Sequence, residues 1–514
     1  MTKKTVLGIE LGSTRIKAIL TDDSGTVIAD GNYEWENKYE NGYWTYSLDS
    51  VWRGLQESFA NLKRNYEEKH KTALTEVSAI GISAMMHGYL AFDKNDKLLV
   101  PFRTWRNTTT GEAADKLTGL FGFNIPQRWS IAHFYQAVLN NEPHADKVNF
   151  LTTLAGYVHY KLTGKKVIGI GDASGMFPIS QNSYDCAMTE KFNRIINKDG
   201  FDIARILPKV LCAGESAGEL TEHGAKLLDV TGKLKPGAKF APPEGDAGTG
   251  MVATNSILPK TANVSAGTSA FLMIVMEKKL ENYYKEIDVV TTPDGMPVSM
   301  IHVNNFSSEI DAWVKMFDEA AKLFGAEVSK SELYERLYSK AMQSDEATGE
   351  LTAYNFLSGE PIVGIENGRP LVVRTPDSRL NLANFMQILI YSALGSLSTG
   401  MEILKKENVK INTVCGHGGF FKSGYVAQSA MSAAVGAPVT VMKNAGEGGA
   451  WGIALLALFT LNGGGKLSDF LDKIFSSSQK TEVEADAKEK ERFKTFMKRY
   501  ISGLTAEKAA GEVL

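Results

Sequence analysis

GIELGSTRIKAIL, residues 8–20, is the stretch of sequence that decides the fold. Apolar residues alternate with small or polar ones up to Leu11 and again from Ile16 to Leu20, which is typical of two half-buried β-strands. This hairpin has an acid before its turn, Glu10, two hydroxyls within the turn and a cation after it, Lys17. An ordinary hairpin turn needs none of these groups. The turn Gly12-Ser13-Thr14 presents backbone N–H groups and hydroxyls without bulky side chains. We therefore interpret it as an anion site, above all for phosphate.

A second hairpin of the same kind lies near the middle of the chain. In NSILPKTANVSAGTSAFLMIVME, residues 255–277, a strand over 261–264 leads into a turn containing Gly267 and Thr268, and a strand over 270–275 follows. Two plain hairpins would be the alternative, but two similar turns, one opening each half, indicate an internal duplication. The Pro- and Gly-rich segment LKPGAKFAPPEGDAGTG, residues 234–250, precedes the second hairpin. We expect the domain crossing there, with one domain over 1–250 and another over 251–514.

Length and composition restrict the class of protein. The chain has 514 residues, more than one core usually supports, and its formal charge of -3 gives no basic field for nucleic acid. Its three cysteines form no metal-binding spacing and indicate a reducing compartment. No apolar run approaches the ~20 residues that span a bilayer, and Lys3-Lys4 leads into a strand rather than a signal peptide. We expect a cytoplasmic enzyme with no nucleic-acid or membrane partner.

The first half alternates strand and helix patterns, which favours an α/β fold. Ser47 and Asp49 are capping candidates before a helical pattern over 51–66. Further patterns predict strands over 77–82 and 89–92 and helices over 112–120, 149–163 and 385–404. The charge-rich tail, residues 476–514, has a helical pattern that we interpret as a solvated cap.

Two acids in glycine-rich surroundings are candidates for chemistry. Asp246, in PPEGDAGTG, could serve as a general base that positions the nucleophile of a phosphoryl transfer. A helix-capping Asp is an equally good interpretation of that residue. Asp172, in GIGDASGMF, is a similar acid, and a turn residue is its alternative.

MMHG, residues 85–88, and TWRN, residues 104–107, interrupt or follow strands. Met86, His87, Trp105, Arg106 and Asn107 offer a stacking surface and several hydrogen-bonding groups, the combination that a polyol requires. A single His within a strand is more often a core residue, so His87 alone is a weak signal.

Two glycine-rich loops occur in the second half, GHGGF at 416–420 and GEGGAWG at 446–452. Their glycines, Gly418, Gly419, Gly448 and Gly449, would let a flat ring or a ribose approach the backbone, and a helix N-terminus favours phosphate. Plain loops are an equally good interpretation. The chain has no GxxxxGK[ST] sequence, so a P-loop is not the source of nucleotide binding.

Taken in order, these motifs resemble those of the FGGY carbohydrate kinases, a branch of the actin-like ATPase fold. The resemblance covers nearly the whole chain: GIELGSTRIK and SAGTS resemble the phosphate hairpins, MHG and WRN the sugar contacts, and GDAGTG the segment with the catalytic acid. GHGGFFKSG and GEGGAWG resemble the adenosine pocket. Within the family the pattern is most similar to xylulokinases, and ribulokinases stay open.

The resemblance implies two ribonuclease H-like domains that flank a catalytic cleft, with ATP and Mg²⁺ between the hairpins. It implies transfer of the γ-phosphoryl group to a terminal hydroxyl of a ketopentose, D-xylulose or L-ribulose, with Asp246 as the base. Mg²⁺ would be held by Glu10 and Asp246 through water, and Asp172 would join the sugar contacts. The residues implied for ATP are Gly12, Ser13, Thr14, Lys17, Gly267, Thr268, Gly418, Gly419, Gly448 and Gly449. A homodimer is common in this family.

Two positions depart from the family pattern. Glu10 stands where Asp is usual, which keeps the charge on a side chain one methylene longer. Asn107 stands where a Trp-Asn-Asp pattern often has a carboxylate, and Arg106 adds a cation, which affects the identity of the sugar more than the reaction. Another polyol or ketose kinase, a mechanical actin-like ATPase and a sugar sensor with negligible turnover are the alternatives. The two phosphate hairpins are compatible with a mechanical ATPase as well as with a kinase, but a mechanical ATPase has no use for sugar contacts.

Overall fold

The computed structural model describes residues 4–442, 448–476 and 478–514, which divide into two compact units. Unit 1 consists of the described residues up to 258 together with 282–298 and 448–476. Unit 2 consists of 259–281, 299–442 and 478–514. Two separate segments, 282–298 and 448–476, thus return to unit 1, so a single boundary in the chain does not divide the two units. The boundary after residue 250 stays a prediction for the functional domains.

Unit 1 is built on a sheet with the strand order β13-β6-β1-β2-β3, in which β14 also pairs with β6. The strands are β1 (Val6–Leu11), β2 (Arg15–Thr21), β3 (Val27–Glu34), β6 (Ala79–Ala84), β13 (Lys239–Phe240) and β14 (Glu244–Gly245). Strand β1 pairs with β2 in antiparallel register, which sets Glu10 opposite Lys17, and with β6 in parallel. The predicted first hairpin is therefore confirmed at the centre of this sheet.

Unit 2 repeats the arrangement around the second hairpin. Its sheet follows the order β18-β16-β15-β21-β22-β23. The strands are β15 (Thr261–Ala266), β16 (Ala270–Val275), β18 (Pro297–Val303), β21 (Thr413–His417), β22 (Val439–Met442) and β23 (Lys480–Val483). Strand β15 has an antiparallel partner, β16, and a parallel partner, β21, as β1 has in β2 and β6. This shared topology confirms the predicted internal duplication.

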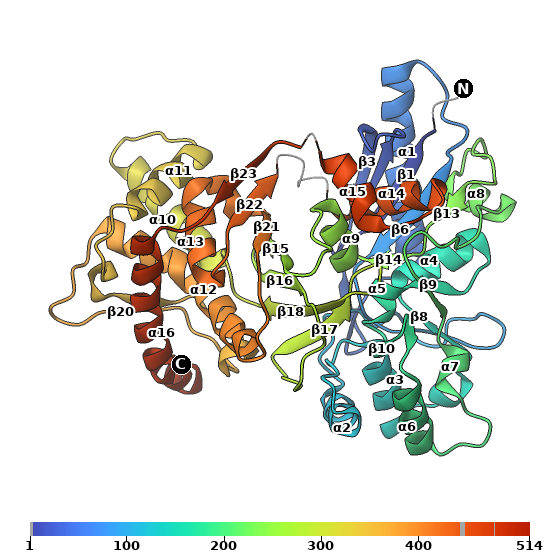
Figure 1. Cartoon of the computed structure of the whole chain (residues 1–514), viewed down its shortest axis with the longest axis horizontal. Helices are drawn as coiled ribbons and strands as arrows, with labels where there is room; N and C mark the ends of the chain where they lie inside the picture. Colours follow the sequence, from blue (N-terminus) through green and yellow to red (C-terminus); the bar gives the residue numbers. More distant parts are fainter. Residues whose placement is uncertain (1–3, 443–447, 477) are drawn as a thin grey trace. The chain divides into compact units, whose positions relative to one another are not determined.

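Short strands and helices complete unit 1 (Figure 1). The helices are α1 (Leu48–His70), α2 (Gly111–Phe121), α3 (Ser130–Leu139), α4 (Leu154–Thr163), α5 (Ile170–Ala173), α6 (Cys186–Ile196), α7 (Ile203–Ile206), α8 (Glu222–Leu228), α9 (Asp246–Ala253), α14 (Gly448–Leu461) and α15 (Leu467–Phe475). The short strands are β4 (Lys38–Glu40), β5 (Tyr43–Thr45), β7 (Leu90–Phe92), β8 (Phe150–Thr152), β9 (Val167–Gly169), β10 (Ile179–Ser180), β11 (Ser183–Tyr184), β12 (Lys209–Leu211) and β17 (Ile287–Thr291).

Alternation along β1 separates an apolar face from a polar one. Leu7, Ile9 and Leu11 join the core cluster with the apolar stripe of α1, which begins at the predicted cap, where Ser47 accepts a hydrogen bond from the Ser50 N–H. Helix α14 packs on the other face, because Gly8, one position from Ile9, meets its backbone. Glu10 shares the face of Gly8 and therefore points toward α14.

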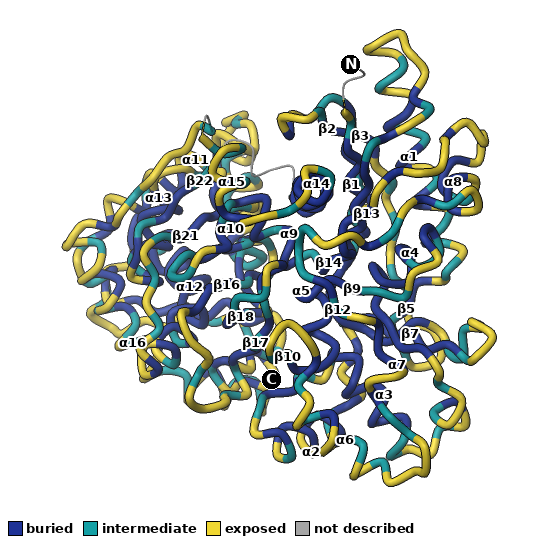
Figure 2. Tube along the Cα trace, turned by 45° about the vertical axis from the view of Figure 1, so that its right-hand side comes forward, coloured by how far each residue is buried: buried dark blue, intermediate teal, exposed yellow. Residues whose placement is uncertain are grey.

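Glycines allow α14 to approach β1, β6 and α9 unusually closely. A Cβ on Gly8 would overlap the carbonyl oxygen of Ala450, and one on Gly81 would lie 2.5 Å from the carbonyl oxygen of Ile453. A Cβ on Gly452 would overlap the carbonyl oxygen of Thr249. Helix α14 is almost entirely buried, and it lies beside β1 in both views (Figures 1 and 2). The absence of side chains at these glycines thus sets the position of the α14 N-terminus.

Unit 2 surrounds its sheet with helices that include the C-terminal segment. These are α10 (Ser308–Leu323), α11 (Lys330–Ala341), α12 (Leu382–Lys406), α13 (Tyr425–Val435) and α16 (Ala487–Val513), with the short hairpin strands β19 (Thr352–Tyr354) and β20 (Leu371–Val373). The helical pattern predicted over 476–514 is confirmed for 487–513, but the interpretation of this segment as a solvated cap was wrong. Strand β23 joins the sheet edge, and α16 buries Phe493, Phe496 and Tyr500 against α12 and α13. Over the described residues, no helix is both long and apolar enough to cross a membrane.

Candidate functional site

The turn of the first hairpin is held by aromatic side chains. The Trp35 indole N–H donates to the Gly12 carbonyl at 2.7 Å, and the Tyr46 hydroxyl donates to the Ser13 carbonyl at 2.6 Å. The Trp35 backbone N–H donates to the Thr14 carbonyl at 3.1 Å. For the N–H groups of Ser13 and Thr14, the described part of the chain provides no hydrogen-bond acceptor. The carbonyls of the turn are thus engaged while two of its N–H groups stay available for an anion.

Glu10 joins this hairpin to α14. Its Oε2 accepts a hydrogen bond from the Ala450 N–H at 3.1 Å, at the N-terminus of the helix. A Cβ on Gly449 would lie 2.5 Å from Glu10 Oε1, so glycine makes room for the carboxyl group. Burial, and then the charge of Asp246, raise the pKa of Glu10 to about 7, whereas Lys17 acts in the opposite direction. The helix N-terminus offsets part of the cost of burying this acid.

Gly448 and Gly449, predicted as adenosine contacts, therefore lie in unit 1 beside Glu10. Their prediction as nucleotide contacts stays a prediction. The part of GEGGAWG over 446–447 lies outside the described residues.

Asp246 is the first residue of α9, directly after β14. Its Oδ1 accepts a hydrogen bond from the Met86 N–H at 3.1 Å, a contact with the MMHG segment. The N-cap residue is Gly245, so Asp246 does not occupy the capping position that the alternative interpretation gave it. Burial raises the pKa of Asp246 to about 6, although the Met86 N–H lowers it. The structure thus brings an acid with a nearly neutral pKa against a predicted sugar-contact segment.

Asp172 lies in α5, 1% exposed, with one oxygen engaged and one not. The Thr153 hydroxyl donates to Oδ2 at 2.6 Å. Oδ1 has no hydrogen-bond partner in the described residues. Burial raises the pKa of Asp172 to about 7, and the charge of Asp246 adds to that rise. A Cβ on Gly245 would lie 3.3 Å from Asp172 Oδ1, so this free acceptor faces the residue before Asp246.

His87 has a left-handed backbone conformation, with φ of 70°. Its Nδ1 lies 3.2 Å from the Gly175 carbonyl, and its ring stacks on Trp129 with 6.3 Å between centroids. Met86 and His87 both lie against Gly175, in the segment that carries Asp172. The predicted residues Met86, His87, Asp172 and Asp246 are thus brought together in unit 1.

Three residues that the sequence did not single out lie in the same surroundings. The Trp129 indole N–H and the Tyr184 hydroxyl are buried without a hydrogen-bond partner among the described residues. Burial, and then the charge of Asp172, raise the pKa of Tyr184 well above its usual range. Glu244, 1% exposed, contacts the backbone of α5. An isolated Trp, Tyr or Glu gave no signal of this proximity.

The side chains of the TWRN segment make contacts within the protein. Both N–H groups of the Asn107 side chain are engaged, donating at 2.9 Å to the carbonyls of Trp44 and Thr104, and its Oδ1 accepts from the Trp44 N–H at 2.8 Å. Arg106 stacks on the Trp44 ring at 4.2 Å. The Trp105 indole N–H donates to the Ser13 hydroxyl oxygen at 3.2 Å. The structure thus ties this segment to β5 and to the phosphate hairpin, and its sugar contacts stay a prediction.

In unit 2, the second hairpin and the GHGGF loop come together. A Cβ on Gly418, which has φ of 106°, would overlap the carbonyl oxygen of Ala266. The Gly267 and Thr268 carbonyls accept hydrogen bonds from the backbone N–H groups of residues 307 and 306. Gly419 begins a short 3₁₀ turn, Gly419–Ser423, with open space where its side chain would be. Gly267, Thr268, Gly418 and Gly419 therefore form one group.

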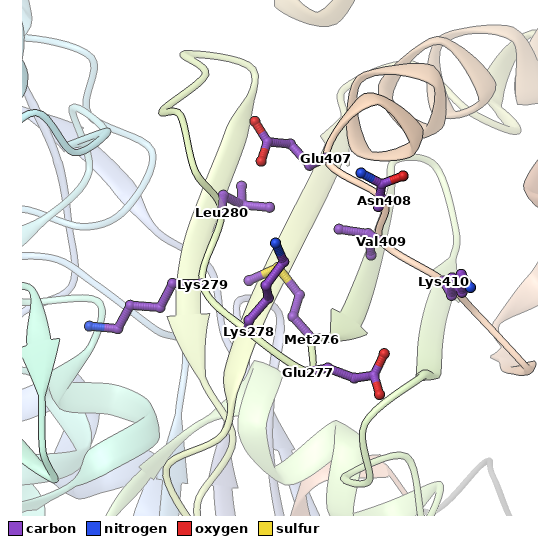
Figure 3. Close-up of a pocket in the computed structure, with 9 residues that line it drawn as sticks. All are labelled: Met276, Glu277, Lys278, Lys279, Leu280, Glu407, Asn408, Val409 and Lys410. Carbon is purple, nitrogen blue, oxygen red and sulfur yellow. The ribbon is translucent and has the colours of Figure 1, made fainter.

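A pocket elsewhere in unit 2 contains none of the predicted residues. It is lined by residues 276–280 and 407–410. In Figure 3 the Lys279 side chain extends away from Glu407 and Asn408. Among the described residues, no group of three or more His, Cys, Asp or Glu side chains is arranged to hold a metal ion.

Comparison with known proteins identifies the class. Residues 5–232 match the N-terminal domain of the FGGY family of carbohydrate kinases, and residues 262–461 match its C-terminal domain. A xylulose kinase of Haemophilus influenzae is 23% identical over 515 residues, covering 97% of this chain and 99% of the relative. The solved structure of a ligand-bound xylulose kinase from Lactobacillus acidophilus covers 99% of both chains with a TM-score of 0.80 at 17% identity. A gluconate kinase structure from the same organism also reaches 0.80, at 18% identity and 99% coverage of both chains.

The duplicated fold and these matches define a carbohydrate kinase with the two-domain architecture of that class. The chain belongs to the FGGY family of carbohydrate kinases and is similar to its xylulose kinases. The predictions of fold class and of a sugar-phosphorylating enzyme are confirmed, and the mechanical ATPase alternative is set aside.

Proposed function

We propose that this chain transfers the γ-phosphoryl group of ATP to a terminal hydroxyl of a ketopentose, with D-xylulose and L-ribulose as the first candidates. The observation that carries the proposal is the position of Asp246, which is held by the Met86 N–H and directly follows Gly245, the residue that the free oxygen of Asp172 faces. A base works best when its pKa is close to the operating pH, and burial raises the pKa of Asp246 to about 6. Asp246 accepts the hydroxyl proton while the sugar oxygen forms a bond to the γ-phosphorus and the bond to ADP breaks.

The acidic surroundings favour a neutral sugar over an aldonate such as gluconate. Asp172 and Asp246 would repel a substrate carboxylate, because like charges in a buried site destabilise one another. Among the described residues, no arginine contributes to the pKa shift of Asp172 or Asp246, and Arg103 and Arg128 are paired with Glu142 and Asp288. A polyol, in contrast, both donates to a carboxylate and accepts from other groups. The unpartnered Trp129 N–H and Tyr184 hydroxyl could supply such groups.

ATP would be bound by the two hairpins. Ser13 and Thr14 offer free N–H groups, Lys17 a positive charge, and Gly267 and Thr268 the corresponding turn of unit 2. Gly418 and Gly419 would accept the adenosine, with Gly448 and Gly449 beside Glu10. Glu10 and Asp246 would hold Mg²⁺ through water, since this ion usually keeps several waters and binds one or two carboxylates with phosphate oxygens. When bound, the ion neutralises charge on the phosphates.

An assay of ADP release with a panel of substrates tests the proposal. The panel contains D-xylulose, L-ribulose, gluconate and glycerol, each with ATP and Mg²⁺. We expect a ketopentose to give the highest kcat/KM together with a sugar phosphate product. A preference for gluconate, or ATP hydrolysis that no sugar stimulates, would contradict the proposal.

A further inference from the structure

Glu244 connects the two segments that carry Asp172 and Asp246. It belongs to β14, which leads directly into α9 and therefore to Asp246. Its Oε1 accepts a hydrogen bond from the Gly171 N–H at 3.2 Å, and its Oε2 accepts one from the Asp172 N–H at 2.9 Å. One buried carboxylate thus holds the backbone of α5 against β14.

The local sequence leaves space for this carboxylate. A Cβ on Gly169 would overlap Glu244 Oε1, and a Cβ on Gly171 would lie 2.5 Å from Oε2. Helix α5 has only four residues, and its N-cap Gly169 supplies no side-chain acceptor for the first N–H groups. The N–H groups of a first helical turn lack partners within the helix. Glu244, in β14, provides the acceptor for two of these groups in α5.

A second contact fixes the side chain of Asp172. The Thr153 hydroxyl donates to Oδ2 at 2.6 Å, while Oδ1 keeps no partner among the described residues and faces Gly245. The Thr153 hydroxyl oxygen also accepts from the Gly156 N–H at 3.2 Å, which ties it to the start of α4. Asp172 is therefore held at its backbone by Glu244 and at one oxygen by Thr153.

We propose that Glu244 and Thr153 are positioning residues of the sugar site. They hold Asp172 so that its Oδ1 accepts a hydrogen bond from one hydroxyl of the sugar, while Asp246 takes the proton from the neighbouring, reacting hydroxyl. This inference rests on the proposed function. It implies that the substrate class is a polyhydroxy compound with a second hydroxyl near the one that is phosphorylated. It also implies that Glu244 affects sugar affinity without touching sugar.

Glu244→Gln tests this role, because an amide replaces one acceptor oxygen with a donor that faces a backbone N–H. We expect the KM and the calorimetric Kd for D-xylulose to rise about 10- to 100-fold, the size of effect that a displacement of about 1 Å in a site produces. The KM for ATP should change by less than about twofold.

Glu360→Gln is the matched control. Glu360 is fully buried in unit 2, and its Oε2 accepts backbone hydrogen bonds from Asn304 and Asn305 at 3.0 and 3.1 Å. It therefore reproduces the loss of a buried carboxylate that binds two N–H groups, but without a contact to Asp172. An equal rise of the D-xylulose Kd in both variants would overturn the inference, as would wild-type affinity in Glu244→Gln.

Thr153 keeps the inference testable if Glu244→Gln does not fold. Thr153→Ser retains the hydroxyl donor to Asp172, whereas Thr153→Val removes it. We expect Thr153→Ser to bind D-xylulose nearly as wild type does and Thr153→Val to show the same sugar-specific loss. Equal affinity of these two variants would refute the positioning role. A wild-type protein that neither binds nor phosphorylates D-xylulose or L-ribulose would instead refute the proposed function.

Discussion

Replacing Asp172 with Asn should stabilise the protein while weakening its sugar binding. The Asp172 carboxyl is 1% exposed, has one oxygen without a partner and lies near the charge of Asp246. No cation pairs with it among the contacts of the described residues, so its charge opposes folding. An asparagine keeps the shape and can still accept the Thr153 hydrogen bond, but carries no charge.

The expected gain follows from the pKa. Burial raises the pKa of Asp172 from 3.8 to about 7, so above pH 7 the folded state bears the full penalty of the charge, which disappears as the pH falls toward 3.8. At pH 8 this corresponds to an upper limit of about 4 kcal/mol, and at pH 5.5 to about 2 kcal/mol. The new amide N–H group without an acceptor costs about 1–2 kcal/mol. We therefore expect Asp172→Asn to raise the free energy of unfolding by about 2–3 kcal/mol at pH 8 and by nearly nothing at pH 5.5.

Urea unfolding followed by tryptophan fluorescence measures this difference. Six of the seven tryptophans lie in unit 1, so the signal reports mainly on the unit that contains Asp172. Asp229→Asn is a contrasting control. Asp229 is also buried, but hydrogen bonds from Thr231 and Lys63 outweigh the effect of burial and lower its pKa, so its loss should destabilise.

Two results would refute the reasoning. Asp172→Asn could be less stable than wild type at pH 8, which would mean that the carboxylate is satisfied in the folded state. The gain could also be equal at pH 8 and pH 5.5, which would exclude a charge penalty as its cause. In the proposed function, the same variant should raise the KM for the ketopentose at least about tenfold, since it converts an acceptor into a donor.

Three further predictions concern catalysis and packing. Asp246→Asn should lower kcat about 10²- to 10⁴-fold with little change in the KM for ATP, and a nearly normal kcat in steady-state assays would contradict this. The kcat/KM of the wild type should fall about tenfold per pH unit below about pH 6, because the base is then protonated. Gly452→Ala should lower the free energy of unfolding by about 2–4 kcal/mol, because its methyl group would overlap the Thr249 carbonyl, whereas Gly250→Ala, which meets nothing, should not. Asn107→Ala should destabilise by about 2–4 kcal/mol in urea unfolding through the loss of three backbone hydrogen bonds, and a raised sugar KM at unchanged stability would instead support a sugar contact.

Local patterns in the sequence were sufficient for the elements that define the fold. The strand predicted over 270–275 matches β16, and the helix predicted behind Ser47 begins at Leu48. Both depend on short-range signals, namely alternation and a capping side chain. The pattern over 149–163 was less informative, because its first residues form β8 and only the remainder forms α4. Apolar residues before a helix fit either element, and pairing with β7, remote in sequence, decides between them.

The return of α14 to unit 1 could not be predicted from the segment itself. Its residues are apolar on all sides, so periodicity identifies no partner surface. The glycines that receive it, Gly8 and Gly81, lie hundreds of residues earlier and look like ordinary strand glycines. Both glycines lie against the backbone of α14, and this contact explains why neither position has a side chain. The acid Glu10 then accepts a hydrogen bond from the Ala450 N–H at the helix N-terminus.

Asn107 and Glu244 show why side-chain chemistry in the sequence does not by itself reveal the contacts that a polar residue makes. An amide beside a Trp and an Arg suggested sugar recognition, yet its two N–H groups donate to the backbone carbonyls of Trp44, 63 residues away, and of Thr104. Glu244 gave no signal, although it stands two residues before Asp246, because a Glu in a Pro- and Gly-rich loop is usually solvated. Its role depends on Gly169 and Gly171, which create the space that a carboxylate then fills. The function of a polar residue thus depends on which of its hydrogen-bonding atoms have no partner within the folded protein. Backbone groups that are distant in sequence decide this, rather than the neighbouring residues.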